Sequence, residues 1–190
     1  MGTLLSTILE AFGLSASAGL NAYIPLLVVS LLAKFTNLIH LAPPWDSLTS
    51  WWTIGVLIVL CLIEAVADKI PAVDHVNDVV QTFIRPTAGA ILFAASAGSV
   101  TEVNPVLLMI CGLLVAGSVH TVKSVLVRPA VTAATAGTGD PVVSFAEDVT
   151  AGFISVLSVV LPIVMLIVII ILVIVIDSWI RRRKRARAAL

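Results

Sequence analysis

Charged residues are scarce in this sequence. They make up 12% of the 190 residues, against about a quarter in a typical soluble domain, whereas hydrophobic residues make up 59%. The mean hydropathy is +1.14. Such a chain has too little polar surface to cover a soluble core. The composition therefore excludes a soluble globular protein and predicts an integral membrane protein with a single domain.

Cysteine is also scarce, with two residues, Cys61 and Cys111, both inside apolar runs. Two buried cysteines exclude a disulfide framework. The sequence contains no nucleophile elbow, phosphate-binding loop, dinucleotide-binding fingerprint or haem ligand pair. We therefore expect neither an enzyme nor a bound cofactor. The first 33 residues contain no Lys or Arg, so a cleavable signal peptide is not expected either.

The formal net charge of zero hides an asymmetry, because six of the eleven basic residues lie within residues 181–190. Basic segments beside a membrane span tend to stay in the cytoplasm. The sequence thus predicts a transmembrane domain over residues 1–180 and a cytoplasmic basic tail over residues 181–190. Anionic lipid headgroups are the expected partner of this tail, since each base near them contributes about 1 kcal/mol. We expect no nucleic-acid partner.

Four apolar segments are predicted to cross the bilayer. In the first of them, Asn21 and Tyr23 are polar and Pro25 interrupts the helical hydrogen bonds. This pattern indicates either a kinked packing helix or the wall of a cavity. Three tryptophans in the following loop predict an aromatic belt at the membrane interface. The four segments are residues 11–33, 53–68, 106–127 and 150–176.

The stretch between the second and third spans is predicted to hold two short elements. Residues 70–85 have helical spacing with an apolar face and a charged face, which predicts an amphipathic helix in the interface plane. Residues 86–99 would reach only about 21 Å as a helix, against a hydrocarbon core of roughly 30 Å. We therefore predict a short re-entrant half-helix there, and a second one over residues 129–137.

An Arg-Pro motif occurs twice, as Arg85-Pro86 and Arg128-Pro129, each after an apolar helix and before a run of small residues. Proline suits the first position of a helix, so each motif is predicted to open a half-helix. Each arginine then either adds positive charge to a helix N-terminus that attracts anions, or extends to the lipid headgroups. The duplication predicts an inverted internal repeat if four helices cross, and a parallel repeat if residues 86–99 cross as well.

The predicted fold is accordingly all-α. We expect a polytopic helical membrane protein with four to five transmembrane helices, short re-entrant or half-helices and an interfacial amphipathic helix. Because four or five helices enclose little volume, we also expect a homo-oligomer.

Ionisable residues inside spans cost roughly 3 kcal/mol or more at the bilayer centre, so they mark candidate sites. Glu64 lies one helical turn, about 6 Å, deeper than Asp68 and is the first candidate. Carboxylates with a histidine can bind a cation or relay protons, but no spacing here matches a metal signature. The alternative is that acids and bases neutralise each other in salt bridges. The candidate solute- or ion-binding residues are Asn21, Glu64, Asp68, Asp74, Asp78, Arg85, His120, Arg128, Glu147 and Asp148, and His75, Lys123 and Asp140 are further ionisable groups in the same segments.

Three segments and one acidic pair resemble a known family. They are ASAGLNAYIP (residues 16–25), ADKIPAVD (67–74), FIRPTAGA (83–90) and Glu147-Asp148. These are similar to a group of small bacterial inner-membrane proteins that is catalogued only as a domain of unknown function. The resemblance covers residues 10–165 and implies a helical fold in a bacterial inner membrane. It implies no activity and no catalytic residue.

Three functions fit these observations. The first, which we favour, is a transporter or channel for a small solute or ion, in which Glu64 and Asp68 bind a cation or proton and Arg85 and Arg128 attract an anion. The second is a non-transporting accessory or assembly protein whose small-residue faces dock onto another membrane complex. The third is a protein that handles lipid phosphates.

Overall fold

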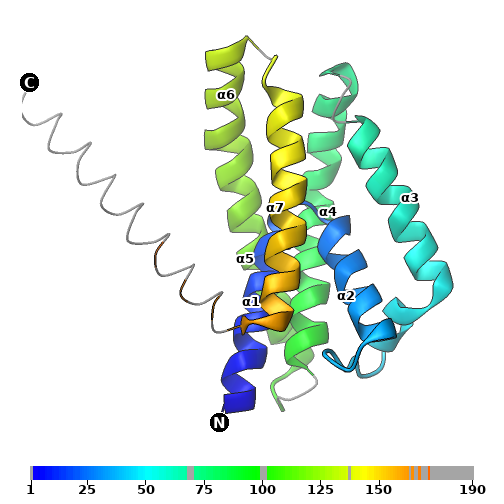
Figure 1. The fold of residues 1–190 in the computed structure, drawn as a ribbon. Coiled ribbons are helices and arrows are strands. Elements are labelled where there is room, and N and C mark those ends of the chain that lie inside the picture. The colour runs from blue at the N-terminus through cyan, green and yellow to red at the C-terminus, as the bar shows by residue number, and fades with distance from the viewer. Residues whose placement is uncertain are drawn as a thin grey trace, which may run out of the picture.

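The computed structural model describes residues 2–67, 71–98, 102–136 and 138–162, together with residues 164, 167 and 171; side chains are described for all of these except residues 2, 3, 71–76 and 78. Over these ranges the chain is helical, with short turns and no strand (Figure 1). The all-α prediction is confirmed. The helices are α1 (Gly2–Leu20), α2 (Tyr23–Phe35), α3 (Trp51–Ala67), α4 (Pro71–Ala97), α5 (Pro105–Val122), α6 (Arg128–Thr135) and α7 (Asp140–Val160), with a 3-10 turn η1 (Trp45–Thr49) and a π-helical turn η2 (Lys123–Val127).

Three helices have the length and composition to cross a membrane. They are the part of α4 from Val79 to Ala97, the continuous helix Pro105–Thr135 made of α5, η2 and α6, and α7 with 21 residues. A helix of 21 residues is about 32 Å long, which matches the hydrocarbon core. Helices α1, α2 and α3 are shorter but also apolar. The chain is a polytopic helical membrane protein.

Helices α3 and α5–α6 run in one direction, and α4 and α7 run in the other (Figure 1). Helix α1 lies antiparallel to α7, because Ser17 Oγ donates to the Ala151 carbonyl at 2.7 Å and Asn21 Nδ2 donates to Asp148 Oδ1 at 2.8 Å. Helix α2 then runs back beside α3 and ends at the same end of the bundle at which α1 begins. There Lys34 Nζ donates to a carbonyl just before α3. The chain therefore reverses between α1 and α2, and the two helices form a hairpin.

This reversal shows that the prediction of one span over residues 11–33 was wrong. Pro25 has no amide hydrogen to bond to the carbonyl four residues earlier, and its ring clashes with that carbonyl in a regular helix. The side chain of Asn21 replaces the lost helical bonds, since its Oδ1 accepts from the amides of Tyr23 at 2.9 Å and Ile24 at 3.0 Å. We call residues 20–23 the hairpin tip.

Small residues bring α1, α4 and α5 into close contact. A Cβ atom on Gly112 would lie 2.2 Å from the carbonyl oxygen of Gly89, and one on Gly19 would lie 2.5 Å from that of Ala116. Ser15 Oγ donates to the Gly89 carbonyl at 2.9 Å. No larger side chain fits at these crossings, which is a common way for helices to associate in membranes.

The first Arg-Pro motif does not open a half-helix. Helix α4 passes through Pro86 without a break, so residues 70–85 and 86–99 do not form two separate elements as predicted. Missing backbone bonds in a membrane helix are tolerated where neighbouring helices cover the site. The half-helix was predicted because residues 86–99 are too short to span alone, but in the structure they extend a longer helix.

The second motif also lies within a continuous helix, which runs from α5 into α6. A π-helical turn precedes Pro129, and in it the amide of Arg128 bonds to the carbonyl of Lys123, five residues back. This wider turn absorbs the clash between a proline ring and the carbonyl four residues earlier. The prediction of a separate half-helix over residues 129–137 was therefore wrong.

The two copies of the motif have different surroundings. In the first copy, α3 is followed by a connection and then by α4, whereas in the second copy a single helix contains both parts. Helices α3 and α5, which precede the motifs, run in the same direction (Figure 1). This arrangement does not support an inverted repeat.

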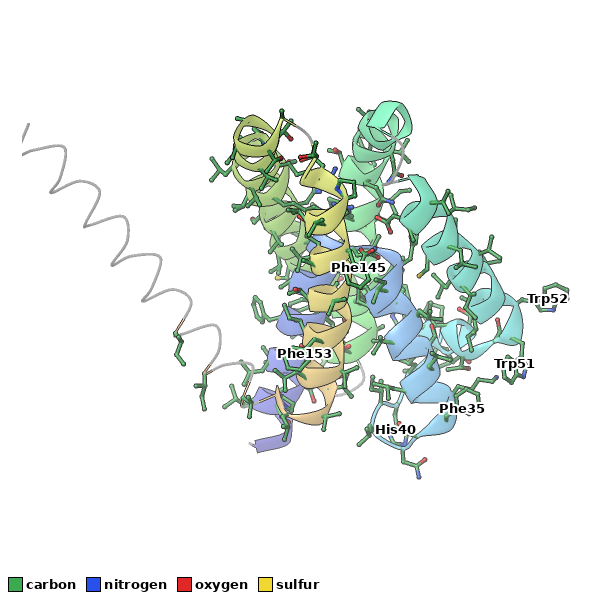
Figure 2. All side chains as sticks on the ribbon, turned by 45° about the horizontal axis from the view of Figure 1, so that its top comes forward. Phe35, His40, Trp51, Trp52, Phe145 and Phe153 are labelled. Carbon is green, nitrogen blue, oxygen red and sulfur yellow. The ribbon has the colours of Figure 1, made fainter. Side chains whose placement is uncertain are left out.

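Aromatic side chains gather where α2 ends and α3 begins. Phe35, Trp51 and Trp52 project outward there (Figure 2), and Trp52 is 87% exposed. The rings of Phe35 and Trp51 meet edge to face at 5.9 Å, and Lys34 Nζ lies 4.4 Å from the centre of the Trp51 ring. Clusters of this kind are typical of the boundary between a membrane and water.

Candidate functional site at the hairpin tip

Buried polar side chains from four helices meet the hairpin tip. Asn21, which is 2% exposed, uses its side-chain oxygen to cap the first amides of α2 and its amide group to bind Asp148 on α7. The preceding residue, Leu20, presents its carbonyl at the end of α1 to the Nζ atom of Lys123 at 3.0 Å. Both broken helix ends are thus bound by side chains.

Lys123 also forms an ion pair that joins α5–α6 to α7. Its Nζ atom lies 2.7 Å from Glu147 Oε2, and the lysine side chain is 4% exposed. Arg128 approaches the same carboxylate oxygen at 3.8 Å and donates to Ser144 Oγ at 3.0 Å. One carboxylate on α7 therefore faces two cations from the neighbouring helix.

A second ion pair joins α3 to α4. Arg85 and Glu64 are each 1% exposed, and the guanidinium NH2 donates to Glu64 Oε1 at 3.0 Å. This guanidinium lies in the middle of α4, at no helix N-terminus, and it does not reach the headgroup region. Both roles predicted for Arg85 from the sequence, anion attraction at a helix N-terminus and snorkelling, are therefore wrong. The predicted alternative of internal salt bridges describes its contacts.

The geometry determines the protonation of His120. Its Nδ1 atom lies 3.3 Å from Arg85 NH1, and its Nε2 atom lies 3.1 Å from Thr82 Oγ1. A guanidinium can only donate hydrogen bonds, so Nδ1 must be the acceptor and carry no proton. The proton of the neutral ring is then on Nε2, which donates to Thr82. The chain Glu64–Arg85–His120–Thr82 is connected by hydrogen bonds throughout.

Gln81 lies one turn before Arg85 on α4 and is 1% exposed. Its side chain lies near Tyr23 at the start of α2. Gln81 Oε1 and Arg85 Nε are buried and have no hydrogen-bond partner among the described residues. They provide an acceptor and a donor one helical turn apart on α4. Gln81 and Thr82 were not recognised as site residues because their spacing placed them on a face expected to contact water.

The ion pairs lie away from the ends of the candidate spans. Arg85 is six residues from the Val79 end of its candidate span and Glu147 is seven residues from the start of α7, which corresponds to about 9 and 10 Å along the helices. Ion pairing offsets much of the cost of placing charges at these positions. The formal charges of the site sum to zero when His120 is neutral. The three acids are Glu64, Glu147 and Asp148, and the three bases are Arg85, Lys123 and Arg128.

The other predicted residues are placed as follows. Asp68 lies outside the described residues, as do the side chains of Asp74, His75 and Asp78. Asp140 lies at the start of α7, two turns from Glu147, and accepts from Thr132 Oγ1 at 3.0 Å. Within the described residues no group of three or more His, Cys, Asp or Glu side chains could hold a metal ion.

A pocket of about 480 Å³ opens beside the Lys123–Glu147 pair. It is lined by Leu20, the last residue of α1, and by residues of α5, η2 and α7. Most of its walls are apolar, and the ion pair lies among them. The pocket-lining residues are Leu20, Ser118, Val119, Val122, Lys123, Val127, Val143, Ala146, Glu147 and Thr150.

Comparison with known proteins identifies a family but no function. The domain of unknown function DUF4126 matches residues 8–182 of the chain. No curated protein and no solved structure matches it.

Proposed function

Because the chain belongs to the DUF4126 family, whose domain has no known function, we propose its activity from the site alone: it is a transporter of a small solute or ion, with its binding site at the hairpin tip. The observation that carries this proposal is the broken α1–α2 helix pair, whose ends are bound by Lys123 and, through Asn21, by Asp148. In many transporters, discontinuous helices use their free ends to bind a substrate and a coupling ion.

The unpartnered atoms on α4 support a binding role. Gln81 Oε1 and Arg85 Nε are an acceptor and a donor without partners among the described residues. A buried polar group without a partner costs about 1–3 kcal/mol, so a role in binding a small polar solute would account for them. The ion pairs next to these atoms do not by themselves indicate a structural role. Replacing a buried ion pair by apolar residues of similar volume often leaves a protein equally stable or more stable.

The two other functions predicted from the sequence are less favoured by the geometry. An accessory protein could not dock through the small residues of α1, α4 and α5, because Gly19, Gly89 and Gly112 are packed inside the bundle. A lipid-phosphate site would need available cations, but Arg85 and Lys123 already face carboxylates. We also propose a bacterial inner-membrane location and a homo-oligomer; the basic tail, which we expect in the cytoplasm, lies outside the described residues.

Flux measurements in proteoliposomes test this function. We would measure the movement of H⁺, Na⁺, K⁺ and Cl⁻ under an imposed diffusion potential. The variant Glu64→Gln removes the charge that faces Arg85, and we expect it to lower the flux of the transported ion at least about tenfold. Glu102→Gln is the matched control, because Glu102 is exposed in a loop away from the tip. Absence of flux for every ion, or equal flux in Glu64→Gln and wild type, would contradict the proposal.

A further inference from the structure

The most unusual polar contact in the bundle is that of Lys123. Its ammonium group is buried, lies against the last carbonyl of α1 and lies 2.7 Å from the Glu147 carboxylate. A carbonyl at a helix C-terminus together with a carboxylate is an oxygen ligand set for a monovalent cation, and the negative end of the helix dipole adds to the attraction. In this chain the ammonium group of Lys123 occupies the position between the Leu20 carbonyl and the Glu147 carboxylate.

We infer that Lys123 binds and releases the coupling proton of transport, and that its ammonium takes the place of a bound monovalent cation at the end of α1. This inference rests on the proposed function and specifies its coupling ion. A buried lysine can lose its proton, whereas an arginine in the same place keeps its charge under all ordinary conditions.

The surrounding charges allow proton release. The ammonium is buried away from water, and Glu147 on α7, the opposite charge that favours it, lies 2.7 Å away. Arg128 on α6 is a like charge that approaches the same carboxylate at 3.8 Å, and Arg85 on α4, a second like charge, contacts His120. From α1 only the Leu20 carbonyl faces Nζ, and the neutral His120 lies one turn earlier on the same helix. One proton can pass from Nζ to Glu147 Oε2, which converts an ammonium and a carboxylate into an amine and a carboxylic acid. The total charge does not change, and two charges in a low-dielectric site disappear.

This proton transfer would loosen the hairpin tip. A neutral amine donates a weaker hydrogen bond than an ammonium, so the end of α1 is held less strongly to α5–α6. Lys123 is also the first residue of the π-helical turn η2, a type of irregularity often found at functional sites, where the helix can rewind. The pocket of about 480 Å³ lies directly beside the pair and offers room for the side chains to separate.

The first test uses Lys123→Arg in proteoliposomes with an internal pH-sensitive dye. Arginine preserves the positive charge and can still face Leu20 and Glu147, but it cannot release a proton. We expect a folded protein whose proton flux falls to the level of protein-free liposomes. The control is Lys34→Arg, at a lysine whose Nζ also binds a carbonyl, that of Thr49, away from the tip; its flux should equal that of wild type.

The outcomes separate the two proposals. Proton flux in wild type and equally in Lys123→Arg overturns the role of Lys123 and leaves the proposed function standing. Absence of any ion flux in wild type overturns both the proposed function and the proton role.

A second test needs no transport and decides whether Lys123 fills a cation site. Lys123→Ala leaves the Leu20 carbonyl and the Glu147 carboxylate facing a space without a cation. We expect the thermal unfolding midpoint of this variant to rise by a few degrees in about 100 mM NaCl or KCl relative to choline chloride, because a ligand that binds only the folded state stabilises it. Wild type and the double variant Lys123→Ala/Glu147→Gln should show no such difference. Equal midpoints in all three salts for Lys123→Ala would overturn the inference.

Discussion

The Glu64–Arg85 ion pair offers the sharpest test of how this fold is held together. Both side chains are almost completely buried, and their closest atoms are 3.0 Å apart. We consider three variants: Glu64→Leu, Arg85→Met, and the two combined. Each single change leaves one buried charge without its partner, whereas the double change removes both charges and keeps most of the volume.

The expected magnitudes follow from this difference. Breaking a buried pair by removing one partner costs about 3–5 kcal/mol of unfolding free energy, because the remaining charge stays desolvated. Replacing both partners by apolar groups is often close to neutral. The contact between Arg85 and His120 adds a smaller loss, about 1 kcal/mol, to every variant that lacks the guanidinium. We therefore expect the double variant to be more stable than either single variant, with a coupling energy of at least about 3 kcal/mol.

Reversible unfolding by sodium dodecyl sulfate in mixed micelles, followed by circular dichroism, measures these free energies. A loss below about 1 kcal/mol in Arg85→Met would refute our reasoning, since it would mean that water screens the pair. A double variant whose loss of unfolding free energy equals the sum of the two single losses would also refute our reasoning. The same variants in proteoliposomes distinguish structure from function: the double variant should regain stability but not flux, because Glu64 and Arg85 are absent from the site.

Two further predictions concern packing and the hairpin. Gly112→Ala should destabilise the bundle by about 1–3 kcal/mol or prevent folding, because its Cβ would lie 2.2 Å from the Gly89 carbonyl oxygen, whereas Gly55→Ala, where nothing lies within 4 Å, should have little effect. Equal thermal midpoints for the two variants would contradict the close contact of α4 and α5. Asn21→Ala removes the cap of α2 and the hydrogen bond to Asp148, so we expect a loss of about 1–3 kcal/mol in the same micelle assay. A loss near zero would mean that the side chain does not hold the hairpin tip.

Some of the site could be predicted from the sequence. Asn21 and Pro25 stood out as polar and helix-breaking residues in an apolar segment, and Glu64 stood out as an acid inside a span. These signals are local. A proline lacks its amide hydrogen in any fold, and a charge is costly in lipid in any fold. The chain is broken at this place, and Glu64 is buried.

Other parts could not be predicted because they depend on neighbours. Arg85, Gln81 and Thr82 form a polar stripe on α4, which a sequence pattern assigns to water. The structure instead buries Gln81 and Arg85, and Glu64 from α3 and His120 from α5 provide hydrogen-bond partners for Arg85 and Thr82. The continuity of α4 through Pro86 likewise depends on the helices around it, since helix length cannot be judged from a segment of 14 residues alone.

Composition and hydropathy thus determined that this chain lies in a membrane and that it is helical, because these properties follow from the cost of exposing each residue or its backbone to lipid. Only the tertiary structure decided the rest. It turned the broken segment into a hairpin instead of a span, and it placed its tip beside Lys123, Glu147 and Asp148. Charges far apart in the sequence become a site only when packing brings them within the few ångströms over which they can neutralise one another.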